Sequence, residues 1–411
     1  MDNFEYEKPG RMFFGRGQLA ALAEQIAKFS PSKRILLTYG ERHLKASGVY
    51  DQIVGLLRAA GIGFEELPGV HSNPRVNLVR DGIALCREQE LDFVLGVGGG
   101  STSDTAKAVA AGVKLKGPIW GAYEDFHTRI PESEKRCVVR DALPFGVVMT
   151  KAGTGSDFDC TSVMSNWDTH EKLMVIAPAL FPKFTVCDPE LTFTLPADQT
   201  AYGTADMMTH VFEQYFSHTS DSPAQDRIKE GLLKTMIECG PIAIAEPTNY
   251  AARANLLYCA SWACSQLAQV GVVNDWASHL IEHELSAATD VNHGLGMAIV
   301  YPGWMRHVIE AGPEKFAQYG ERVWGICRAG RNDLEVGHEA IDRTQAFWSS
   351  MGIATTLAEA GVEADVLPRA ARQAVRFGPI GAYRPLNEAN VLEILHSVAG
   401  APVEAGELAA V

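Results

Sequence analysis

Short apolar runs alternate with amphipathic stretches in the first half of the chain. The run Ile35–Tyr39 precedes an amphipathic stretch over Gly48–Ala60, and Phe93–Val97 precedes another over Ser101–Val113. A third apolar run covers Pro144–Met149. Buried strands that alternate with helices in this way are typical of βαβ units. The pattern therefore predicts a mostly parallel sheet covered by helices.

The apolar residues of the second half recur with the 3.6-residue period of helices. The clearest of these stretches are Ala201–Ser217, Ala224–Cys239, Ala251–Val270 and Pro313–Cys327. Strand-like alternation is nearly absent beyond Leu195. We therefore predict an α/β domain over residues 1–195 and an all-helical domain over residues 196–411. A length of 411 residues agrees with this division, since a domain averages ~150 residues.

Composition and charge exclude several classes of partner. Hydrophobic residues make up 46% and charged residues 21%, as in ordinary globular proteins. A net charge of −14 argues against a nucleic-acid partner. The apolar runs are far shorter than the ~20 residues of a membrane helix, and the start MDNFEYEKPG lacks a signal-peptide pattern. The cysteines form no CxxC pair. We expect a cytoplasmic protein.

A glycine-rich turn follows the second apolar run and opens the next predicted helix. Its residues 96–101 read GVGGGS. Adjacent glycines let the backbone approach a pyrophosphate, and the N–H groups of a helix N-terminus favour an anion. The turn therefore predicts a phosphate site, although it matches neither GxGxxG nor a Walker loop. Ser101 and Asp104 also fit a capping box, so capping and ligand contact are both open for Asp104.

Four histidines and one aspartate cluster by spacing in the helical half. Asp206 and His210 are four residues apart, so both project from one helix face. His279 and His283 repeat this spacing, and His293 follows. One carboxylate with three or four imidazoles suits Zn²⁺ or Fe²⁺ and leaves a position for water or substrate. The segment HLIEHE places its glutamates differently from HExxH, which disfavours a zinc protease.

These motifs, taken in order, resemble the iron-containing (group III) alcohol dehydrogenase family, which has the dehydroquinate synthase-like fold. The resemblance covers nearly the whole chain and includes GGGSTSDTAK (98–107), MTKAGTGSD (149–157), DPELTFTLP (188–196) and the histidine cluster. TYGERHLKASGVYDQ, DWASHLIEHELSA and ERVWGI are most similar to NADPH-dependent butanol dehydrogenases and broad-range aldehyde reductases. The resemblance implies a Rossmann-like N-terminal domain, a helical metal-binding domain and a homodimer.

The resemblance also implies roles for individual residues. The metal ligands would be Asp206, His210, His279 and His293, while His283 would lie near the nicotinamide and relay protons. The residues that hold the pyrophosphate would be Gly98, Gly99, Gly100, Ser101 and Asp104. The residues that line the rest of the cofactor cleft would be Asn73, Thr150, Thr154 and Lys172.

The residues that follow the first predicted strand bear on the choice between NAD and NADP. A carboxylate just past a strand typically holds the 2′-hydroxyl of NAD, whereas the 2′-phosphate of NADP needs that charge removed and a cation nearby. NAD-preferring relatives usually carry Asp at about Gly40, and Arg42 and Lys45 follow here, with Glu41 as an opposing charge. We therefore expect NADP(H) in preference to NAD(H), with Gly40 and Arg42 at the phosphate.

The expected reaction transfers hydride between NADP(H) and a primary alcohol/aldehyde pair. The cation would act as a Lewis acid on the carbonyl, NADPH would deliver hydride to carbon, and water or His283 would supply the proton. Phe158, Trp276 and Met297 are the apolar candidates for the substrate pocket. Two alternatives stay open: a polyol (glycerol-type) dehydrogenase of the same fold, and a non-catalytic nucleotide-binding protein with a structural metal. A dehydroquinate synthase is disfavoured because no basic cluster lies beside the ligand positions.

Overall fold

A parallel sheet forms the core of the first half of the molecule. The computed structural model describes residues 1–128, 131, 133 and 135–400, without the side chains of residues 41 and 42. Within these residues, six parallel strands pair in the order β1-β8-β5-β4-β2-β3. Their bounds are β1 Arg11–Phe14, β2 Arg34–Tyr39, β3 Gly63–Pro68, β4 Phe93–Gly98, β5 Phe145–Met149 and β8 Phe184–Cys187. The predicted parallel sheet is confirmed.

Helices cover both faces of this sheet, because successive side chains of a strand point to opposite faces. In β2, Leu36 joins the core formed with α4 and α5, whereas Ile35 and Leu37 join the core formed with α1 and α3. Burial on both faces explains why the strands read as continuous apolar runs. The helices of this half are α1 Leu22–Phe29, α2 Glu41–Ala46, α3 Val49–Ala59, α4 Val76–Glu88, α5 Gly100–Lys114 and α6 Ile119–His127.

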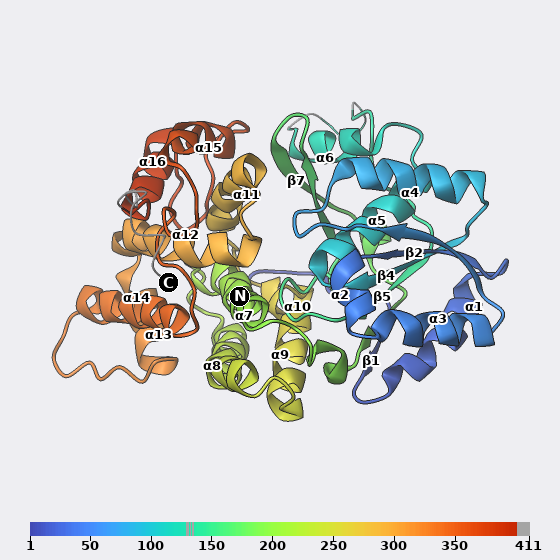
Figure 1. The fold of residues 1–411 in the computed structure, drawn as a ribbon. Coiled ribbons are helices and arrows are strands. Elements are labelled where there is room, and N and C mark those ends of the chain that lie inside the picture. Colours follow the sequence, from blue (N-terminus) through green and yellow to red (C-terminus); the bar gives the residue numbers. More distant parts are fainter. Residues whose placement is uncertain (129–130, 132, 134, 401–411) are drawn as a thin grey trace, which may run out of the picture.

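An antiparallel hairpin lies outside the main sheet and was missed by the sequence analysis. It consists of β6 (Thr161–Asn166) and β7 (Glu171–Ile176). The hairpin packs on α5 and α6 and reaches α11 of the second half. Figure 1 shows β7 at the junction between the two halves. It therefore brings residues of the α/β half next to the helices that carry the histidines.

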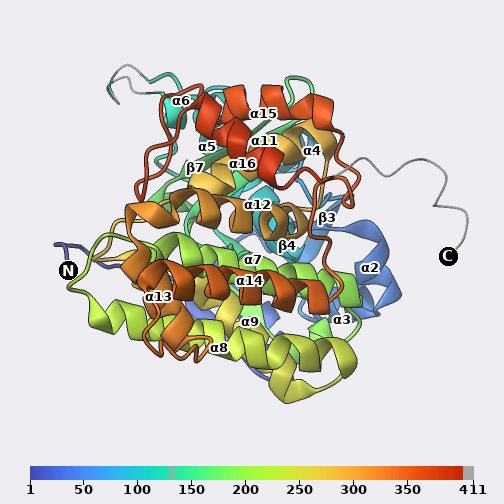
Figure 2. The same ribbon diagram turned by 90° about the vertical axis from the view of Figure 1, so that its left-hand side faces the viewer.

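The second half is mainly helical, as predicted, and lies beside the sheet half (Figure 1). Helix α7 is central and packs against α8, α9 and α12 (Figure 2). The single helix expected over Ala251–Val270 is wrong, because the chain breaks it into α9 and α10. None of the helices in the described ranges is both long and apolar enough to cross a bilayer. Their bounds are α7 Ala197–Tyr215, α8 Pro223–Ala245, α9 Tyr250–Ala263, α10 Gln266–Gln269, α11 Ala277–Thr289, α12 His293–Val308, α13 Pro313–Arg322, α14 Asp333–Ser350, α15 Leu367–Ala374 and α16 Glu388–Ser397.

Candidate active site

The glycine-rich turn lies at the carboxyl end of β4, between the ends of β2 and β5. Helix α5 begins there at Gly100, with Gly99 as its N-cap. The backbone N–H groups of Thr102 and Ser103 both donate to the Gly99 carbonyl at 3.1 Å. The N–H groups ahead of them open the helix, and such groups favour an anion. The turn thus has the backbone arrangement expected of a phosphate site.

Of the two interpretations left open for Asp104, the capping box with Ser101 at the start of α5 is wrong. The hydroxyl of Ser101 donates to the Ser72 carbonyl instead of capping the helix. Asp104 accepts a hydrogen bond from the Ser156 hydroxyl at 2.7 Å instead of reaching back to Ser101. The physical reason is that an N-cap residue must precede the helix, whereas Ser101 already lies inside its first turn.

Two adjoining cavities run from this turn to the histidine cluster. The first, of about 290 Å³, extends from the end of β2 past the glycine turn. The second, of about 190 Å³, lies between the hairpin and α11. Both are lined by Ser72, Ser101, Thr154 and His293, so the two cavities are neighbours, and together they are called the cleft. A cleft at the carboxyl edge of a parallel sheet is where α/β folds bind dinucleotides.

Most of the predicted site residues line this cleft. Those that line the first cavity are Gly40, Gly98, Gly99, Gly100, Ser101, Thr150, Thr154, Asp206 and His293. Those that line the second cavity are Ser101, Asp104, Thr154, Lys172, His210, His279, His283 and His293. Asp104 therefore faces the second cavity and is absent from the described lining of the first, where Gly98, Gly99 and Gly100 lie.

One predicted cofactor residue, Asn73, does not line the described cleft. Asn73 is only 1% exposed and lies behind Lys172. Its carboxamide already bonds to Lys172, to Asp290 at 2.9 Å and to the Val291 carbonyl at 3.2 Å. The expectation that Asn73 lines the cleft is therefore corrected to a supporting position. Arg42 begins near the first cavity in α2, but its side chain lies outside the described part of the structure.

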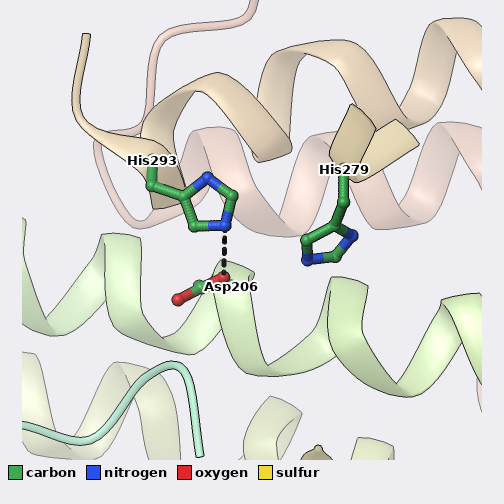
Figure 3. A group of neighbouring side chains, drawn as sticks. All are labelled: Asp206, His279 and His293. Atoms are coloured by element: carbon green, nitrogen blue, oxygen red, sulfur yellow. Dashed lines mark ion pairs between the residues drawn. The ribbon is translucent and has the colours of Figure 1, made fainter. Parts of the chain in front are cut away.

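Three of the four predicted metal ligands converge at the end of the cleft (Figure 3). Asp206 of α7, His279 of α11 and His293 of α12 present ligand atoms that all lie within 4.8 Å of one another. His293 Nε2 is 3.6 Å from Asp206 Oδ1. Asp206 Oδ1 also lies 3.2 Å from His210 Nδ1, whereas His279 Nε2 is buried and has no hydrogen-bond partner among the described residues. Buried polar atoms are rarely left unpaired, so this donor set fits a divalent cation such as Zn²⁺ or Fe²⁺.

Two buried glutamates orient these imidazoles, and the sequence analysis did not identify them. Glu213 Oε1 lies 2.7 Å from His279 Nδ1, and Glu282 contacts His293 Nδ1. Both glutamates are 0% exposed. A carboxylate on Nδ1 fixes the tautomer and leaves Nε2 for a metal. In the sequence, the only hint of their role is that each glutamate lies close to one of the histidines, His210 or His283. Both glutamates otherwise look like ordinary helix residues.

The remaining two histidines lie beside this cluster. His210 donates from Nδ1 to the Asp206 carbonyl at 2.8 Å, and its ring centroid is 4.5 Å from that of His279. Among the described residues, His210 is not part of the group whose ligand atoms lie within 4.8 Å. His283 lies farther along α11, with its ring centroid 5.6 Å from that of His293, and faces the second cavity.

The local electrostatics favour the metal-binding protonation state at Asp206, His279 and His283 but not at His210: burial opposes its protonation, yet the Asp206 carboxylate raises its pKa above the usual value. Burial opposes ionisation of Asp206, but the imidazoles of His210 and His293 hold its pKa below the usual value. Burial and the neighbouring His210 lower the pKa of His279 well below 6.5. Burial and the Lys172 ammonium do the same to the pKa of His283. An ionised carboxylate and neutral imidazoles are the forms that coordinate metals.

The apolar part of the second cavity differs from the prediction. Trp276 lines it, as expected. Met297 is 0% exposed within the helical core, and Phe158 packs against Trp262 and beneath Lys8, so neither belongs to the described lining. The other large apolar side chains of the cavity come mainly from the hairpin and α11: Val163, Met174, Ile176 and Leu280.

Comparison with known proteins identifies the family. Residues 9–189 match the family "Iron-containing alcohol dehydrogenase", and residues 200–399 match "Fe-containing alcohol dehydrogenase family, C-terminal". The chain is 43% identical to a probable NADH-dependent butanol dehydrogenase of Bacillus subtilis, over 96% of this chain and 99% of the relative. It is 36% identical to an NADPH-dependent aldehyde reductase of Escherichia coli, over 90% of this chain and 92% of the relative.

A solved structure gives the same result. The crystal structure of an NADH-dependent butanol dehydrogenase A from Thermotoga maritima matches with a TM-score of 0.90 at 33% identity, over 97% of this chain and 99% of that chain. The resemblance inferred from the motifs is thereby confirmed, as is the combination of a Rossmann-like sheet half with a helical half. The chain belongs to the iron-containing alcohol dehydrogenase family.

Proposed function

We propose that the protein is a metal-dependent oxidoreductase that transfers hydride between NADP(H) and a primary alcohol/aldehyde pair. It acts as an aldehyde reductase or a butanol-type alcohol dehydrogenase. The observation that carries this proposal is the convergence of Asp206, His293 and the unpaired buried atom His279 Nε2 at the end of a cleft that begins at a glycine-rich helix N-terminus. Two relatives named for butanol or aldehyde chemistry support the substrate class.

The metal site combines residues of three helices. Asp206, His279 and His293 hold the divalent cation, and His210 completes the set through the nitrogen that its bond to the Asp206 carbonyl leaves free. When bound, the cation supplies Lewis acidity to the substrate oxygen. Glu213 and Glu282 keep the two facing imidazoles oriented from behind.

The other residues position the dinucleotide and handle the proton. Gly98, Gly99, Gly100 and Ser101 cradle the pyrophosphate, and Thr150, Thr154 and Lys172 line the path toward the metal. His283 borders the second cavity as a neutral imidazole and relays a proton to or from the substrate oxygen. Asp104 borders the same cavity and is the remaining candidate for a contact with the pyrophosphate.

The apolar lining favours alkyl substrates over polyols. Met174, Ile176 and Leu280 offer no hydrogen-bonding side-chain group to a polyol, and burial of an alkyl chain against such side chains is favourable by ~0.8 kcal/mol per CH₂. Butanal is therefore the first substrate to test, and glycerol is the comparison.

The preference for NADP(H) rests on the end of β2. Gly40 lines the first cavity there and contributes no carboxylate that would repel a 2′-phosphate. His43 and Leu44 line the same end. The Bacillus relative is named for NADH and the Escherichia relative for NADPH. The assay therefore compares NADH and NADPH directly.

The test is oxidation of NADPH and of NADH at 340 nm with butanal, on protein stripped of metal and then reloaded separately with Zn²⁺ and Fe²⁺. We expect activity that returns only with metal and is higher with NADPH. Activity with NADH alone would overturn the cofactor assignment. A His279→Ala variant that retains both its metal and aldehyde reduction would overturn the proposed site, and dinucleotide binding without turnover of any aldehyde would favour the non-catalytic alternative.

A further inference from the structure

The Glu282 carboxylate is buried at the boundary between the metal cluster and the cofactor cleft. It is 0% exposed, and its Oε2 atom contacts two partners, His293 Nδ1 and, at 3.4 Å, Lys172 Nζ. His293 belongs to the helical half and Lys172 to the hairpin of the α/β half. An ionised carboxylate that is removed from water costs several kcal/mol unless it is paired and hydrogen-bonded. Glu282 meets this condition through partners in both halves of the protein.

Neighbouring residues hold this carboxylate in place. Ser286, one turn farther along α11, donates its hydroxyl to Glu282 Oε1. Gly296 of α12 leaves room for the side chain, because a Cβ atom at this position would lie 2.8 Å from Glu282 Oε1 and 2.9 Å from its Cγ. The orientation of the Glu282 side chain is therefore set by Ser286 on its own helix and by the space that Gly296 leaves on α12.

The contacts continue from Glu282 toward the cofactor cleft. Lys172 Nζ also donates to Asn73 Oδ1 at 3.1 Å. The Asn73 side-chain amide in turn donates hydrogen bonds to Asp290 and to the carbonyl of Val291. Val291 lies two residues before His293. Lys172 is 4% exposed and lines the second cavity. The lysine that faces the cavity is thus positioned by the same carboxylate that orients His293.

We propose that Glu282 is a positioning residue that couples metal binding to dinucleotide binding. If His293 holds the cation through Nε2, its Nδ1 would stay directed at Glu282, and the carboxylate held there would keep Lys172 at the wall of the cleft. By thermodynamic linkage a bound dinucleotide then tightens metal binding by the same factor. This inference rests on the proposed metal and cofactor sites.

The test uses Glu282→Gln, which keeps the shape of the side chain and removes its charge. Zn²⁺ affinity is measured on the full-length apoprotein by competition with a chromophoric chelator. NADPH affinity is measured by fluorescence, with and without Zn²⁺. We expect the wild type to bind NADPH more tightly with Zn²⁺ than without it, by about 5- to 150-fold. In Glu282→Gln, Zn²⁺ binding should weaken by about 10- to 100-fold. The ratio of the NADPH affinities measured with and without Zn²⁺ should fall toward one.

Two further variants separate coupling from a merely structural role. Lys172→Met should abolish the effect of Zn²⁺ on NADPH affinity but leave Zn²⁺ affinity without dinucleotide within about twofold of the wild type, because Glu282 still contacts His293. Glu284→Gln is the matched control, since Glu284 lies on the same helix, is 6% exposed and pairs with Arg376 away from the cluster. It should resemble the wild type in both measurements.

Several results would overturn the inference. Wild-type metal affinity and wild-type coupling in Glu282→Gln would show that the carboxylate positions nothing. Two ions per wild-type chain and one per Glu282→Gln chain would make Glu282 a ligand of a second ion, as its closeness to His283 and His293 allows. A wild-type protein that binds neither Zn²⁺ nor NADPH would reject the proposed function together with the inference, whereas binding of both without coupling would reject the inference alone.

Discussion

Replacement of Gly100 by alanine tests whether the close approach between α5 and the loop after β5 shapes the cofactor cleft. A Cβ atom at Gly100 would lie 2.0 Å from Thr154 Oγ1, 2.7 Å from its Cγ2 and 2.9 Å from its Cβ. Rotation of the Thr154 side chain cannot relieve this clash, because its Cβ atom does not move with χ1. The loop backbone must therefore shift by about 1 Å to reach ordinary contact, and overpacking of this kind costs about 1–3 kcal/mol.

The expected loss is larger for function than for stability. Thr154 and Gly100 both line the cleft, and misplacement of a positioning group by about 1 Å can cost about 100-fold in rate. We predict that Gly100→Ala lowers the free energy of unfolding in urea by about 1–3 kcal/mol, weakens NADPH binding in a fluorescence titration and lowers kcat/KM by about 100-fold.

Removal of the clashing side chain should reverse part of this loss. In a Thr154→Gly background the side-chain atoms that meet the new methyl group are absent, so Gly100→Ala should weaken NADPH binding less there than in the wild type. Gly55→Ala in α3 is the control, because a Cβ atom there meets nothing within 4 Å. Wild-type stability and cofactor affinity in Gly100→Ala, or an equal effect of Gly100→Ala in both backgrounds, would refute the reasoning.

Three further predictions concern metal and pH. Glu213→Gln should weaken Zn²⁺ binding by about 10- to 100-fold, because the carboxylate that accepts from His279 Nδ1 and the Trp276 N–H is lost; unchanged affinity in a chelator competition would show that packing alone orients His279. Zn²⁺ at about 100 times its Kd should stabilise the apoprotein by about 2.7 kcal/mol, seen as a higher melting temperature that His279→Ala no longer shows. Burial raises the pKa of Asp104 from 3.8 to about 7, so the folded protein keeps a proton that the unfolded chain releases. The stability contributed by this group is complete below about pH 4 and is lost as pH rises to about 7, by up to about 4 kcal/mol. In Asp104→Asn, the free energy of unfolding in urea should depend less on pH between pH 5 and 7.5. A pH slope of the unfolding free energy equal to that of the wild type would contradict this prediction.

The sequence predicted those parts of the molecule that leave a periodic signal. Strands β2, β4 and β5 are buried on both faces and read as apolar runs, and Asp206 and His210 stand one helical turn apart. The hairpin β6–β7 was missed because it packs on helices instead of extending the sheet. Its residues nevertheless form one wall of the second cavity, so the sequence analysis assigned wrong apolar residues to the pocket.

Tertiary contacts explain the errors at single residues. Asn73 belongs to a residue type that is common in turns. Its side-chain amide nevertheless donates hydrogen bonds to Asp290 and Val291, which lie more than two hundred positions away in the sequence. Glutamates are mostly exposed in proteins, and only the packing of α7, α11 and α12 reveals that Glu213 and Glu282 are both buried against imidazoles. Local pattern carries no information about such long-range partners.

The unpaired nitrogen of the cluster gives the strongest physical argument for a bound cation. A buried polar atom without a partner costs about 1–3 kcal/mol, and His279 Nε2 falls in this class among the described residues. A domain is stable by only about 5–15 kcal/mol in total, so this cost is a noticeable share of it. Glu213 maintains the cost, since it fixes the imidazole in the orientation that leaves Nε2 facing Asp206 and His293. An arrangement that opposes folding in the apoprotein is offset when a cation occupies the point toward which these atoms converge, and the stabilisation expected with Zn²⁺ measures that offset directly.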